Sequence, residues 1–436
     1  MSKSTNILQE SVAVILAAGM GTRMRSSKPK AMHPLAGKPM LRYLLDNVEK
    51  IFDKVVVVVG PDMDEVAALA APHQVVVQKD RLGTAHAAMQ AEPYFGKGTV
   101  TILYADNPLV SQKTLRNILE CQQQHGVDMV LMAMECVDPK SYGRVIEKNG
   151  WVRRIVETAD ATEKEKKNHL CNAGVLCAKV KSFKYWLHQI ENKNSKREYY
   201  LVDAVAVAVQ EGRRIKALRA SEDELSGINS KSELAIAEHI VQKKLRKKAM
   251  DNGVTMIAPE TVFLSADTVL DEDVIIYPHV VFGPNVHVHS GVEIRSFSHL
   301  EGCEVKKGAI IGPYARLRPA AVIGQDAHVG NFVELKATIL GEGAKVNHLT
   351  YLGDTEVGRK TNIGAGTITC NYDGVHKHKT IIGEEAFIGS DTILVAPVEI
   401  GNKSLIAAGS VITEDVPENT LAFGRARQVN KNKTAK

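Results

Sequence analysis

Short runs of aliphatic and β-branched residues alternate with longer mixed segments over the first 229 residues. These runs cover residues 12–16, 55–59, 75–78, 100–104 and 129–134. Apolar runs of strand length that are separated by helix-length segments are typical of βαβ units. The pattern therefore predicts an α/β domain with a mostly parallel sheet over residues 1–229.

Residues 230–253 have a different pattern. From Ser232 to Met250 the segment contains neither Gly nor Pro and is rich in residues with high helix propensity. We predict a helix that links two domains. The basic cluster at residues 243–248 is interpreted as a solvated helix face, although nucleic-acid binding is an alternative for such a charge run.

From residue 254 to residue 436, aliphatic residues recur at every sixth position. Neither a helix, with its period of 3.6, nor an ordinary strand, with its period of 2, sustains such a repeat. A solenoid of short parallel strands does, because one apolar side chain of each hexad points inward. One series is Ile311, Leu317, Ile323, Val329 and Leu335, and the other is Ile382, Ile388, Leu394, Ile400, Ile406 and Ile412.

The hexad repeat has two further features. Small or β-branched residues lie four positions after the aliphatic ones in the first series, at Ala315, Ala321, Ala327, Val333 and Ile339. The frame slips between Leu335 and Leu340 and is interrupted at residues 369–381. Because an insertion in a solenoid forms a loop on one face, commonly the binding face, we expect chemistry near this interruption.

Composition and charge narrow the class of protein. The 436 residues, 44% hydrophobic and 24% charged, predict a globular chain of two or three domains. A formal net charge of +5 is too small to indicate nucleic-acid binding. No apolar run approaches the roughly 18 residues that a membrane span needs, and the N-terminus has no signal-peptide pattern, so we expect a cytoplasmic location. The six scattered cysteines predict buried, reduced thiols.

A glycine-rich turn, A-A-G-M-G-T-R-M at residues 17–24, follows the first predicted strand. Its backbone N–H groups can hold phosphate oxygens, and Arg23 and Lys30 add positive charge. The turn is neither a dinucleotide fingerprint, because Met24 stands where Gly is needed, nor a Walker A motif. Asp106, after the strand at 100–104, is a candidate Mg²⁺ ligand, with a helix N-cap or turn role as the alternative.

Several motifs in both halves together carry a family resemblance. The turn, followed by Pro29 and Lys30, resembles the signature of sugar-nucleotide pyrophosphorylases, and residues 78–87 resemble their base- and sugar-contacting loop. The sequences N-H-L-T-Y-L-G-D at 347–354 and N-I-G-A-G-T-I-T-C-N-Y-D-G at 362–374 extend the likeness. From residue 12 to residue 425 the chain resembles the bifunctional bacterial enzymes of the GlmU family.

The resemblance implies two activities on one chain. The family acetylates glucosamine-1-phosphate with acetyl-CoA and then couples N-acetylglucosamine-1-phosphate to UTP, releasing pyrophosphate. The implied architecture is a Rossmann-like uridylyltransferase domain, a linking helix and a left-handed parallel β-helix that forms a homotrimer. The left hand follows from the resemblance alone, since ordinary crossovers are right-handed.

The resemblance also implies the site residues. Arg23 and Lys30 act in uridylyl transfer, and Asp106 and Asn229 hold Mg²⁺. The remaining uridylyl-site residues are Leu16, Ala17, Ala18, Gly19, Gln78, Gly83, Thr84, Tyr104, Gly143, Glu157 and Asn172. His348 is the general base of acetyl transfer. The sugar phosphate is expected against Arg318, Lys336, Tyr351, Asn362 and Lys377, and acetyl-CoA against Ala365, Asn371, Tyr372, Ser390, Ala408 and Arg425.

Two departures from the family pattern and three alternatives accompany this interpretation. Met20 replaces a common Lys, and Ala105 replaces the Gly that usually precedes the metal-binding Asp. One alternative is a single-function pyrophosphorylase with a structural or regulatory β-helix. Another is a nucleotidyltransferase that makes a different nucleotide sugar, and a third is a scaffolding subunit. His287, His289 and His299 are interpreted as coil-surface residues, so no compact metal cage is expected in the solenoid.

Overall fold

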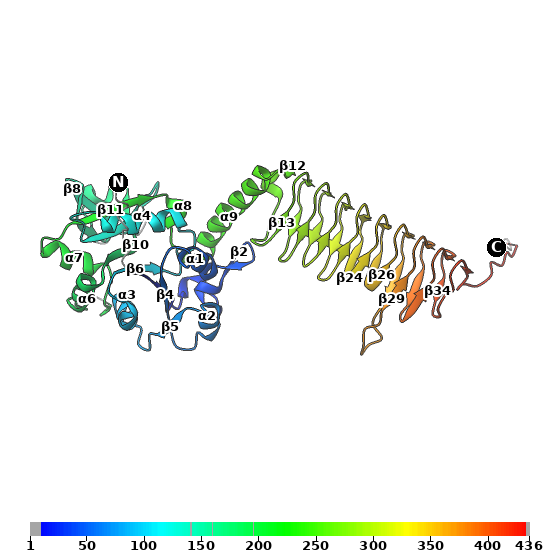
Figure 1. The fold of residues 1–436 in the computed structure, drawn as a ribbon, viewed down its shortest axis with the longest axis horizontal. Coiled ribbons are helices and arrows are strands. Elements are labelled where there is room, and N and C mark those ends of the chain that lie inside the picture. Colours follow the sequence, from blue (N-terminus) through cyan, green and yellow to red (C-terminus); the bar gives the residue numbers. More distant parts are fainter. Residues whose placement is uncertain (1–9, 140–141, 159, 195, 433–436) are drawn as a thin grey trace, which may run out of the picture. The chain divides into compact units, whose positions relative to one another are not determined.

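The computed structural model describes residues 10–139, 142–158, 160–194 and 196–432. The chain divides into two compact units, Met1–Ile240 and Val241–Lys436 (Figure 1). In the part of the chain that the structure describes, no helix is both long enough and apolar enough to cross a membrane.

The first unit is built on a nine-stranded sheet with the main order β11-β7-β10-β6-β1-β4-β5. β1 pairs in parallel with β4 and β6, whereas β10 is antiparallel to β6 and β7. The sheet is therefore mixed rather than mostly parallel as predicted. β1, β4, β5 and β6 form a parallel group and β11 is parallel to β7, but β8, β9 and β10 pair antiparallel. Its strands are β1 (Ser11–Leu16), β4 (Lys54–Val59), β5 (Gln74–Val77), β6 (Thr99–Tyr104), β7 (Met129–Glu135), β8 (Arg144–Lys148), β9 (Trp151–Val156), β10 (Leu170–Lys179) and β11 (Ile215–Ala220), beside a small ribbon of β2 (Pro34–Leu35) and β3 (Lys38–Pro39).

Helices cover both faces of this sheet. Along β1, Val12, Val14 and Leu16 belong to one apolar core, and Ala13 and Ile15 belong to a second core. A strand buried on both faces reads as a continuous apolar run, which explains the sequence pattern. One core includes residues of α3 (Thr84–Gln90), α6 (Val180–His188) and α7 (Asp203–Gln210), and the other includes residues of α1 (Met40–Val48), α2 (Asp64–Leu69), α4 (Gln112–Gln123) and α8 (Glu222–Leu225). Short helices complete the unit: α5 (Glu163–Lys166), η1 (Thr22–Met24), η2 (Lys30–Met32) and η3 (Glu92–Tyr94).

The helix α9 (Lys231–Asp251) contains the boundary between the two units. Its four lysines between 243 and 248 are exposed, in agreement with a solvated face. Arg246 differs, because its side chain is 7% exposed and donates a 3.0 Å hydrogen bond to the carbonyl oxygen of Val262. The basic cluster is therefore partly structural.

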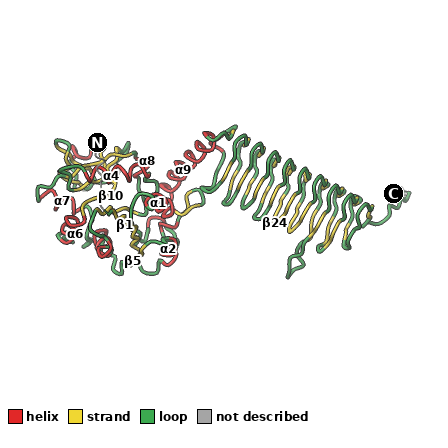
Figure 2. The backbone as a smooth tube through the Cα atoms, viewed as in Figure 1, coloured by secondary structure: helices red, strands yellow, loops and turns green. Residues whose placement is uncertain are grey.

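The second unit is a parallel β-helix whose strands are mostly two or three residues long and are separated by turns (Figure 2). Its ten-stranded sheet contains β12 (Thr255–Met256), β14 (Ile275–Ile276), β17 (Glu293–Ile294), β20 (Ile310–Ile311), β23 (His328–Asn331), β25 (Lys345–His348), β27 (Asn362–Ile363), β30 (Phe387–Ile388), β33 (Leu405–Ile406) and β35 (Leu421–Ala422).

The other sheet of this unit has fourteen strands, and the short helix η4 (Pro259–Thr261) precedes it. Its main path is β13 (Val269–Leu270), β16 (His287–Val288), β19 (Glu304–Val305), β22 (Val322–Ile323), β24 (Glu334–Leu340), β26 (Tyr351–Val357), β28 (Ile368–Cys370), β31 (Ile393–Val395) and β34 (Val411–Ile412). Paired off this path are β15 (Val281–Phe282), β18 (His299–Leu300), β21 (Arg316–Leu317), β29 (Thr380–Ile382) and β32 (Val398–Ile400).

The aliphatic positions of the hexad repeat form the core of the β-helix, since all eleven are buried. The small-residue series is buried from Ala315 to Val333 but ends at Ile339, which is 47% exposed, whereas Leu340 is 1% exposed. Ala337 adopts a positive φ of 46°, and after it Thr338 and Leu340 face inward. Positive φ angles recur six residues apart at Tyr314, Ala320, Asp326 and Phe332, but Ala337 follows Phe332 by only five residues, and this short step is the frame slip.

The interruption of the repeat forms a loop between β28 and β29 that projects from the coils (Figure 1). Cys370, at the end of β28, is exposed, and the other five cysteines are buried. All six thiols are free. The prediction of buried cysteines is thus wrong for Cys370, which lies where the chain leaves the regular coil.

The inward hexad positions should dominate the stability of the β-helix. Ile323→Ala removes a side chain that is 0% exposed, so it should lower the free energy of unfolding of the neighbouring coils by about 2–5 kcal/mol. Ile339→Ala makes the same chemical change at a 47% exposed position and should cost far less. Native-state hydrogen exchange of the coil amides measures both effects. Equal losses in the two variants would contradict the assigned core.

Candidate functional site

A cleft of about 410 Å³ opens at the carboxyl ends of β1 and β6 in the first unit. Parallel sheets bind ligands at this edge. The predicted residues that line the cleft are Leu16, Ala17, Ala18, Gly19, Arg23, Lys30, Gln78, Gly83, Thr84, Tyr104, Asp106 and Asn229. Segments that are far apart in sequence therefore meet in one cavity.

The glycine-rich turn forms one wall of the cleft. Gly21 has a φ of 63°, and a Cβ atom there would lie 2.7 Å from Cβ of Lys30. Gly21 thus allows Lys30 to pack against the turn. Met20 is exposed, and Ala105 is buried in the cleft wall with its N–H donated to the Leu16 carbonyl oxygen at 3.1 Å.

The loop after β5 forms the opposite wall. Gly83 has a φ of 112°, and a Cβ atom there would lie 2.4 Å from the carbonyl oxygen of Tyr199. The buried Gln78 donates a 3.1 Å hydrogen bond from Nε2 to the Gly83 carbonyl oxygen. Thr84 Oγ1 accepts a 2.9 Å hydrogen bond from the N–H of Leu201. These contacts fix the loop against the segment at 199–201.

A cationic side chain lies between two oxygen atoms at the base of the cleft. Lys30 Nζ contacts Asp106 Oδ2 and donates a 2.7 Å hydrogen bond to Asn229 Oδ1. Arg23 donates a 2.8 Å hydrogen bond to the same Asn229 oxygen. The N–H of Ile228 donates to the Asp106 carbonyl oxygen at 2.9 Å, so backbone contact holds the two oxygen-bearing residues together.

The Asp106 and Asn229 oxygens fit a magnesium ion. Mg²⁺ prefers one or two protein oxygen ligands and completes its octahedron with phosphate and water oxygens. Here a carboxylate oxygen and an amide oxygen converge on the Lys30 ammonium group, which is itself a cation.

Gly143, Glu157 and Asn172 form a separate group beside the cleft. The N–H of Asn172 donates to the Gly143 carbonyl oxygen at 2.8 Å, and a Cβ atom at Gly143 would lie 3.0 Å from Glu157 Oε1. Burial raises the pKa of Glu157, and the Asp160 and Asp203 carboxylates raise it further. The structure brings these three predicted residues together, but they are not among the residues that line the cleft.

The cleft lining also includes residues that the sequence did not assign to the site, among them the polar residues Arg81, Glu198 and Tyr200. Arg81 Nε donates a 2.9 Å hydrogen bond to the Ala18 carbonyl oxygen, which links the two walls. Arg81 lies inside the motif at 78–87, so its position and its positive charge could have identified it as a site residue from the sequence. Glu198 and Tyr200 have no comparable signal, because only the folding of residues 199–201 against Gly83 brings them to the cleft.

In the second unit, the predicted acetyl-transfer residues follow two lines along the coils. The first line consists of the residues that occupy the position of His348, at the end of β25, in successive coils. Asn331 pairs with His348, and the backbone hydrogen bonds from Gly366 to His348, Asp391 to Ala365 and Gly409 to Ser390 continue the register. His348, Ala365, Ser390 and Ala408 are therefore equivalent positions in successive coils. Arg425 lies beside Gly409, with its Cδ atom 4.0 Å from a Cβ built there.

Asn331 determines which nitrogen of His348 carries the proton. His348 Nδ1 lies 3.0 Å from Asn331 Oδ1, and an amide oxygen only accepts. Nδ1 therefore donates, which leaves the lone pair of Nε2 available. Asn331 is a positioning residue that the sequence did not single out.

The second line is a cluster of cations near the projecting loop. Arg318 follows Leu317, whose register partner is Leu335, so Arg318 and Lys336 occupy equivalent positions in adjacent coils. The contact with Lys377 lowers the pKa of Lys336, and the charge of Arg318 lowers it further. Such a cluster is suited to a phosphate group.

Residues of β26 and the loop border this cluster. A Cβ atom at Gly353 would lie 2.4 Å from the Tyr351 hydroxyl and 2.7 Å from Asn371 Nδ2, so this glycine leaves room for both side chains. Asn371 donates to Asp354, and the Tyr372 hydroxyl donates to the Gly374 carbonyl oxygen at 2.6 Å. Asn362, in β27, is half-buried in the other sheet.

Hydrogen bonds within the projecting loop hold its conformation. The hydrogen bond from His378 and those from the N–H groups of His376 and Val375 lower the pKa of Asp373 to about 2. Between residues 196 and 432, no hydrogen bond or ion pair joins His348 to the cluster of Arg318, Lys336 and Lys377. The two lines are therefore not joined by a direct polar contact within this part of the chain.

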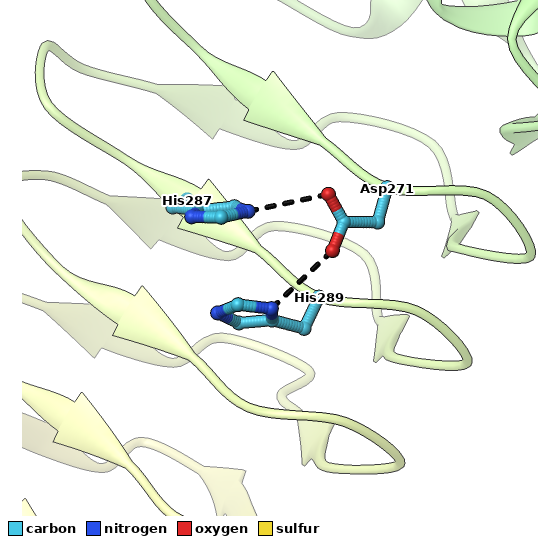
Figure 3. Close-up of side chains that lie close together, drawn as sticks. All are labelled: Asp271, His287 and His289. Carbon is cyan, nitrogen blue, oxygen red and sulfur yellow. Dashed lines mark hydrogen bonds and ion pairs between the residues drawn. The ribbon is translucent and has the colours of Figure 1, made fainter.

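The expectation that the solenoid offers no compact metal cage is wrong. Asp271, His287 and His289 lie together on the outward side of the first coils (Figure 3), with one potential ligand atom from each within 4.8 Å of the others. All three are surface residues of the coils, but the register of adjacent strands brings them together.

Comparisons with known proteins cover both units. Residues 13–168 match the MobA-like NTP transferase domain, and residues 379–414 match the hexapeptide repeat of succinyl-transferase. The bifunctional protein GlmU of Gluconacetobacter diazotrophicus is 63% identical over 96% of this chain and 92% of its own length. The corresponding proteins of Granulibacter bethesdensis and Bartonella quintana are 59% and 45% identical, over 96% and 97% of this chain and 94% and 96% of their own lengths.

Gly83 should be more sensitive to a methyl group than another glycine of similar conformation. Gly83→Ala places Cβ 2.4 Å from the Tyr199 carbonyl oxygen, whereas Gly212, with a φ of 75°, has no atom within 4 Å of such a Cβ. Gly212→Ala should cost about 1–2 kcal/mol from backbone strain, and Gly83→Ala should cost more. Both tryptophans, Trp151 and Trp186, belong to the first unit, so denaturation followed by tryptophan fluorescence reports on this unit. Equal shifts of the two midpoints would contradict the close contact.

Proposed function

The chain belongs to the family of bifunctional GlmU proteins, and on this premise we propose how its two units divide the synthesis of UDP-N-acetylglucosamine. It is a bifunctional transferase, with a nucleotidyltransferase unit and a hexapeptide-repeat acetyltransferase unit. The assignment of nucleotidyl transfer to the first unit rests on one observation. The glycine-rich turn, Lys30, Asp106 and Asn229 converge in one cleft.

In the first unit, a phosphate oxygen of N-acetylglucosamine-1-phosphate attacks the α-phosphorus of UTP. A new P–O bond forms as the bond to the pyrophosphate leaving group breaks. The nucleophile is already an anion, so the chain needs no general base for this step. Its task is to align two anions and to offset their repulsion. The turn amides, Arg23 and Lys30 are suited to that task.

Asp106 and Asn229 are the residues that would hold Mg²⁺ in this cleft. The ion supplies Lewis-acid stabilisation of phosphate charge when it is bound. The Lys30 ammonium group now neutralises Asp106, and it becomes available to a phosphate when another cation binds the carboxylate. Gly143, Glu157 and Asn172 are proposed to contact the sugar and ribose from beside the cleft.

In the second unit, the amine of glucosamine-1-phosphate attacks the thioester carbonyl carbon of acetyl-CoA. The C–N bond forms, the C–S bond breaks, and the coenzyme A thiolate leaves. His348 Nε2 accepts the amine proton, because the hydrogen bond to Asn331 commits Nδ1 as a donor. We place the sugar phosphate against Arg318, Lys336 and Lys377, with Tyr351 and Asn362 beside it.

The column of equivalent positions supports an extended acetyl-CoA site. Ala365, Ser390 and Ala408 continue the line of His348, and all three side chains are small. Small side chains in successive coils leave space for a long pantetheine chain along the coils. Asn371, Tyr372 and Arg425 would contact its two ends.

A homotrimer would complete the acetyl-transfer site. His348 and the cation cluster are separate groups within one chain, so an adjacent subunit is proposed to contribute to each site. Phe297, Tyr314 and Phe332 also stack in consecutive coils, with ring centroids 4.9 and 5.2 Å apart, and about half of each side chain is exposed. An exposed aromatic ridge of this kind favours self-association.

The two half-reactions should separate by mutation. His348→Ala should reduce acetyl transfer by about 10²–10⁴-fold and leave uridylyl transfer unchanged, because it removes only the general base. Asp106→Asn keeps the side-chain size but removes the charge, so it should do the reverse. Both half-reactions are measured on each variant with supplied sugar phosphates and mass-spectrometric product detection.

Chelation gives a second arm of this experiment. EDTA should abolish uridylyl transfer, with Mg²⁺ restoring it, while acetyl transfer continues. A His348→Ala protein with full acetyltransferase activity would remove His348 from its role and favour the single-function alternative. Unchanged circular dichroism confirms that each variant is folded, and tryptophan fluorescence adds a check on the first unit for the Asp106 variant.

The trimer proposal predicts that dilution affects the two activities differently. Light scattering at micromolar concentration should give a mass of three chains. Dilution below the dissociation range should lower the specific acetyltransferase activity, since the site then lacks its neighbour, and should leave the specific uridylyltransferase activity constant. A monomer mass together with full acetyltransferase activity would rule out a shared site.

A further inference from the structure

Three side chains outside both proposed sites converge near the start of the β-helix (Figure 3). Asp271 follows β13, and His287 and His289 lie on either side of Val288 at β16. We propose that these three residues bind one divalent transition-metal ion, with Zn²⁺ as the representative. This inference does not depend on the proposed function.

The strand pattern explains why the two histidines share one face. In H-V-H, alternate side chains point to opposite sides of a strand. Val288 is fully buried in the core, so His287 and His289 both point outward, and their rings stack with centroids 4.1 Å apart. Val269 pairs with His287 and Leu270 with Val288, which places Asp271 at the position equivalent to His289 in the preceding coil.

One potential ligand atom from each residue lies within 4.8 Å of the others, so small side-chain rotations would bring all three to one ion. Asp271 Oδ1 lies 3.2 Å from His287 Nε2, and Asp271 Oδ2 lies 3.3 Å from His289 Nδ1. Two ligands about 2.0–2.1 Å from a tetrahedral zinc ion are about 3.3–3.4 Å apart. Each side chain is between one-quarter and two-fifths exposed, so small rotations are possible and an ion can enter from solvent.

A second carboxylate orients His289 for metal binding. His289 Nε2 lies 2.8 Å from Glu304 Oε1, and Lys306 also contacts this carboxylate. Because the carboxylate accepts, Nε2 carries a proton, so Nδ1 is the nitrogen of the neutral ring that can present a lone pair to a metal ion beside Asp271. A carboxylate behind a ligating histidine is the usual outer partner of a metal ligand in proteins.

The donor set determines the class of ion. Two imidazole nitrogens and one carboxylate oxygen suit Zn²⁺ and related transition metals, whereas Mg²⁺ and Ca²⁺ prefer oxygen ligands. Three protein ligands leave the fourth tetrahedral position for water. The site is therefore distinct in chemistry from the oxygen ligands of Asp106 and Asn229 in the first unit.

The position of the three residues indicates a structural role. β13 begins the path of the fourteen-stranded sheet, so one of its edges has no preceding strand on that path. The terminal coil of a solenoid contacts a neighbour on one side only. A metal ion held by Asp271 from one coil and by two histidines from the next would fasten this end.

Zinc binding is tested on the full-length protein in buffer with excess Mg²⁺, by equilibrium dialysis and calorimetry. The wild type should bind one more Zn²⁺ per chain than the His287→Ala/His289→Ala double variant. Glu304→Gln should weaken this binding by about 10–100-fold, the effect typical of losing an outer partner of a ligand. His299→Ala, which removes an exposed histidine of β18, is the matched control and should bind zinc as the wild type does.

Hydrogen exchange supplies an independent measurement. Zn²⁺ should slow exchange of the amides between residues 269 and 306 in the wild type and in His299→Ala, and should have no such effect in the double variant. Equal zinc stoichiometry and affinity in the wild type and the double variant would overturn the proposal, and so would displacement of the bound Zn²⁺ by equimolar Mg²⁺. In either case Asp271 and the histidines would form proton-dependent ion pairs only.

Discussion

Register between parallel strands is the constraint on which both units depend. In the first unit, Leu16 pairs with Tyr104, so the turn after β1 and Asp106 after β6 must emerge at the same edge of the sheet. In the second unit, one buried aliphatic residue per hexad fixes the coil register, and His348 is thereby stacked with Ala365 and Ser390. A slip of one residue would turn every such side chain to the opposite face. The apolar core thus determines the position of polar groups that it does not contain.

Charge balance in the first cleft follows from this placement. Asp106 and Asn229 present oxygens to one small volume, and Lys30 compensates them. Asp106 is only about one-fifth exposed, so an unpaired carboxylate there would be costly. The same arrangement allows ligands to replace the ion pair between Lys30 and Asp106. A second cation can bind Asp106 while a phosphate binds Lys30, so neither charge is left unpaired.

The sequence predicted those features that a local period or a local motif encodes. The strands β1, β4, β5, β6 and β7 of the first unit and the inward hexad positions are of this kind, because burial imposes its period directly on the residues, whereas β8 to β11 were not predicted. Ile339 departs from its series because the turn at Ala337 comes five residues after the turn at Phe332 instead of six. Arg246 departs from its cluster because it donates a hydrogen bond to the Val262 carbonyl oxygen. Most uridylyl residues reach the cleft as predicted, whereas Glu198, Tyr200 and the Asp271 cluster depend on contacts between segments that no local pattern records.

The two proposed phosphate sites differ in how their cations are partnered. In the first, each nearby cation already has an oxygen partner, so a substrate must compete for Arg23 and Lys30. In the second, Lys336 and Lys377 approach each other, and this like-charge contact lowers the pKa of Lys336. A lowered pKa means that the folded protein disfavours the charged form relative to the unfolded chain, so the repulsion opposes folding at neutral pH. A bound phosphate dianion would offset that repulsion, because it favours both ammonium groups at once. Arg318 already has a carboxylate partner in Glu334, so the gain from such a ligand would fall mainly on the two lysines.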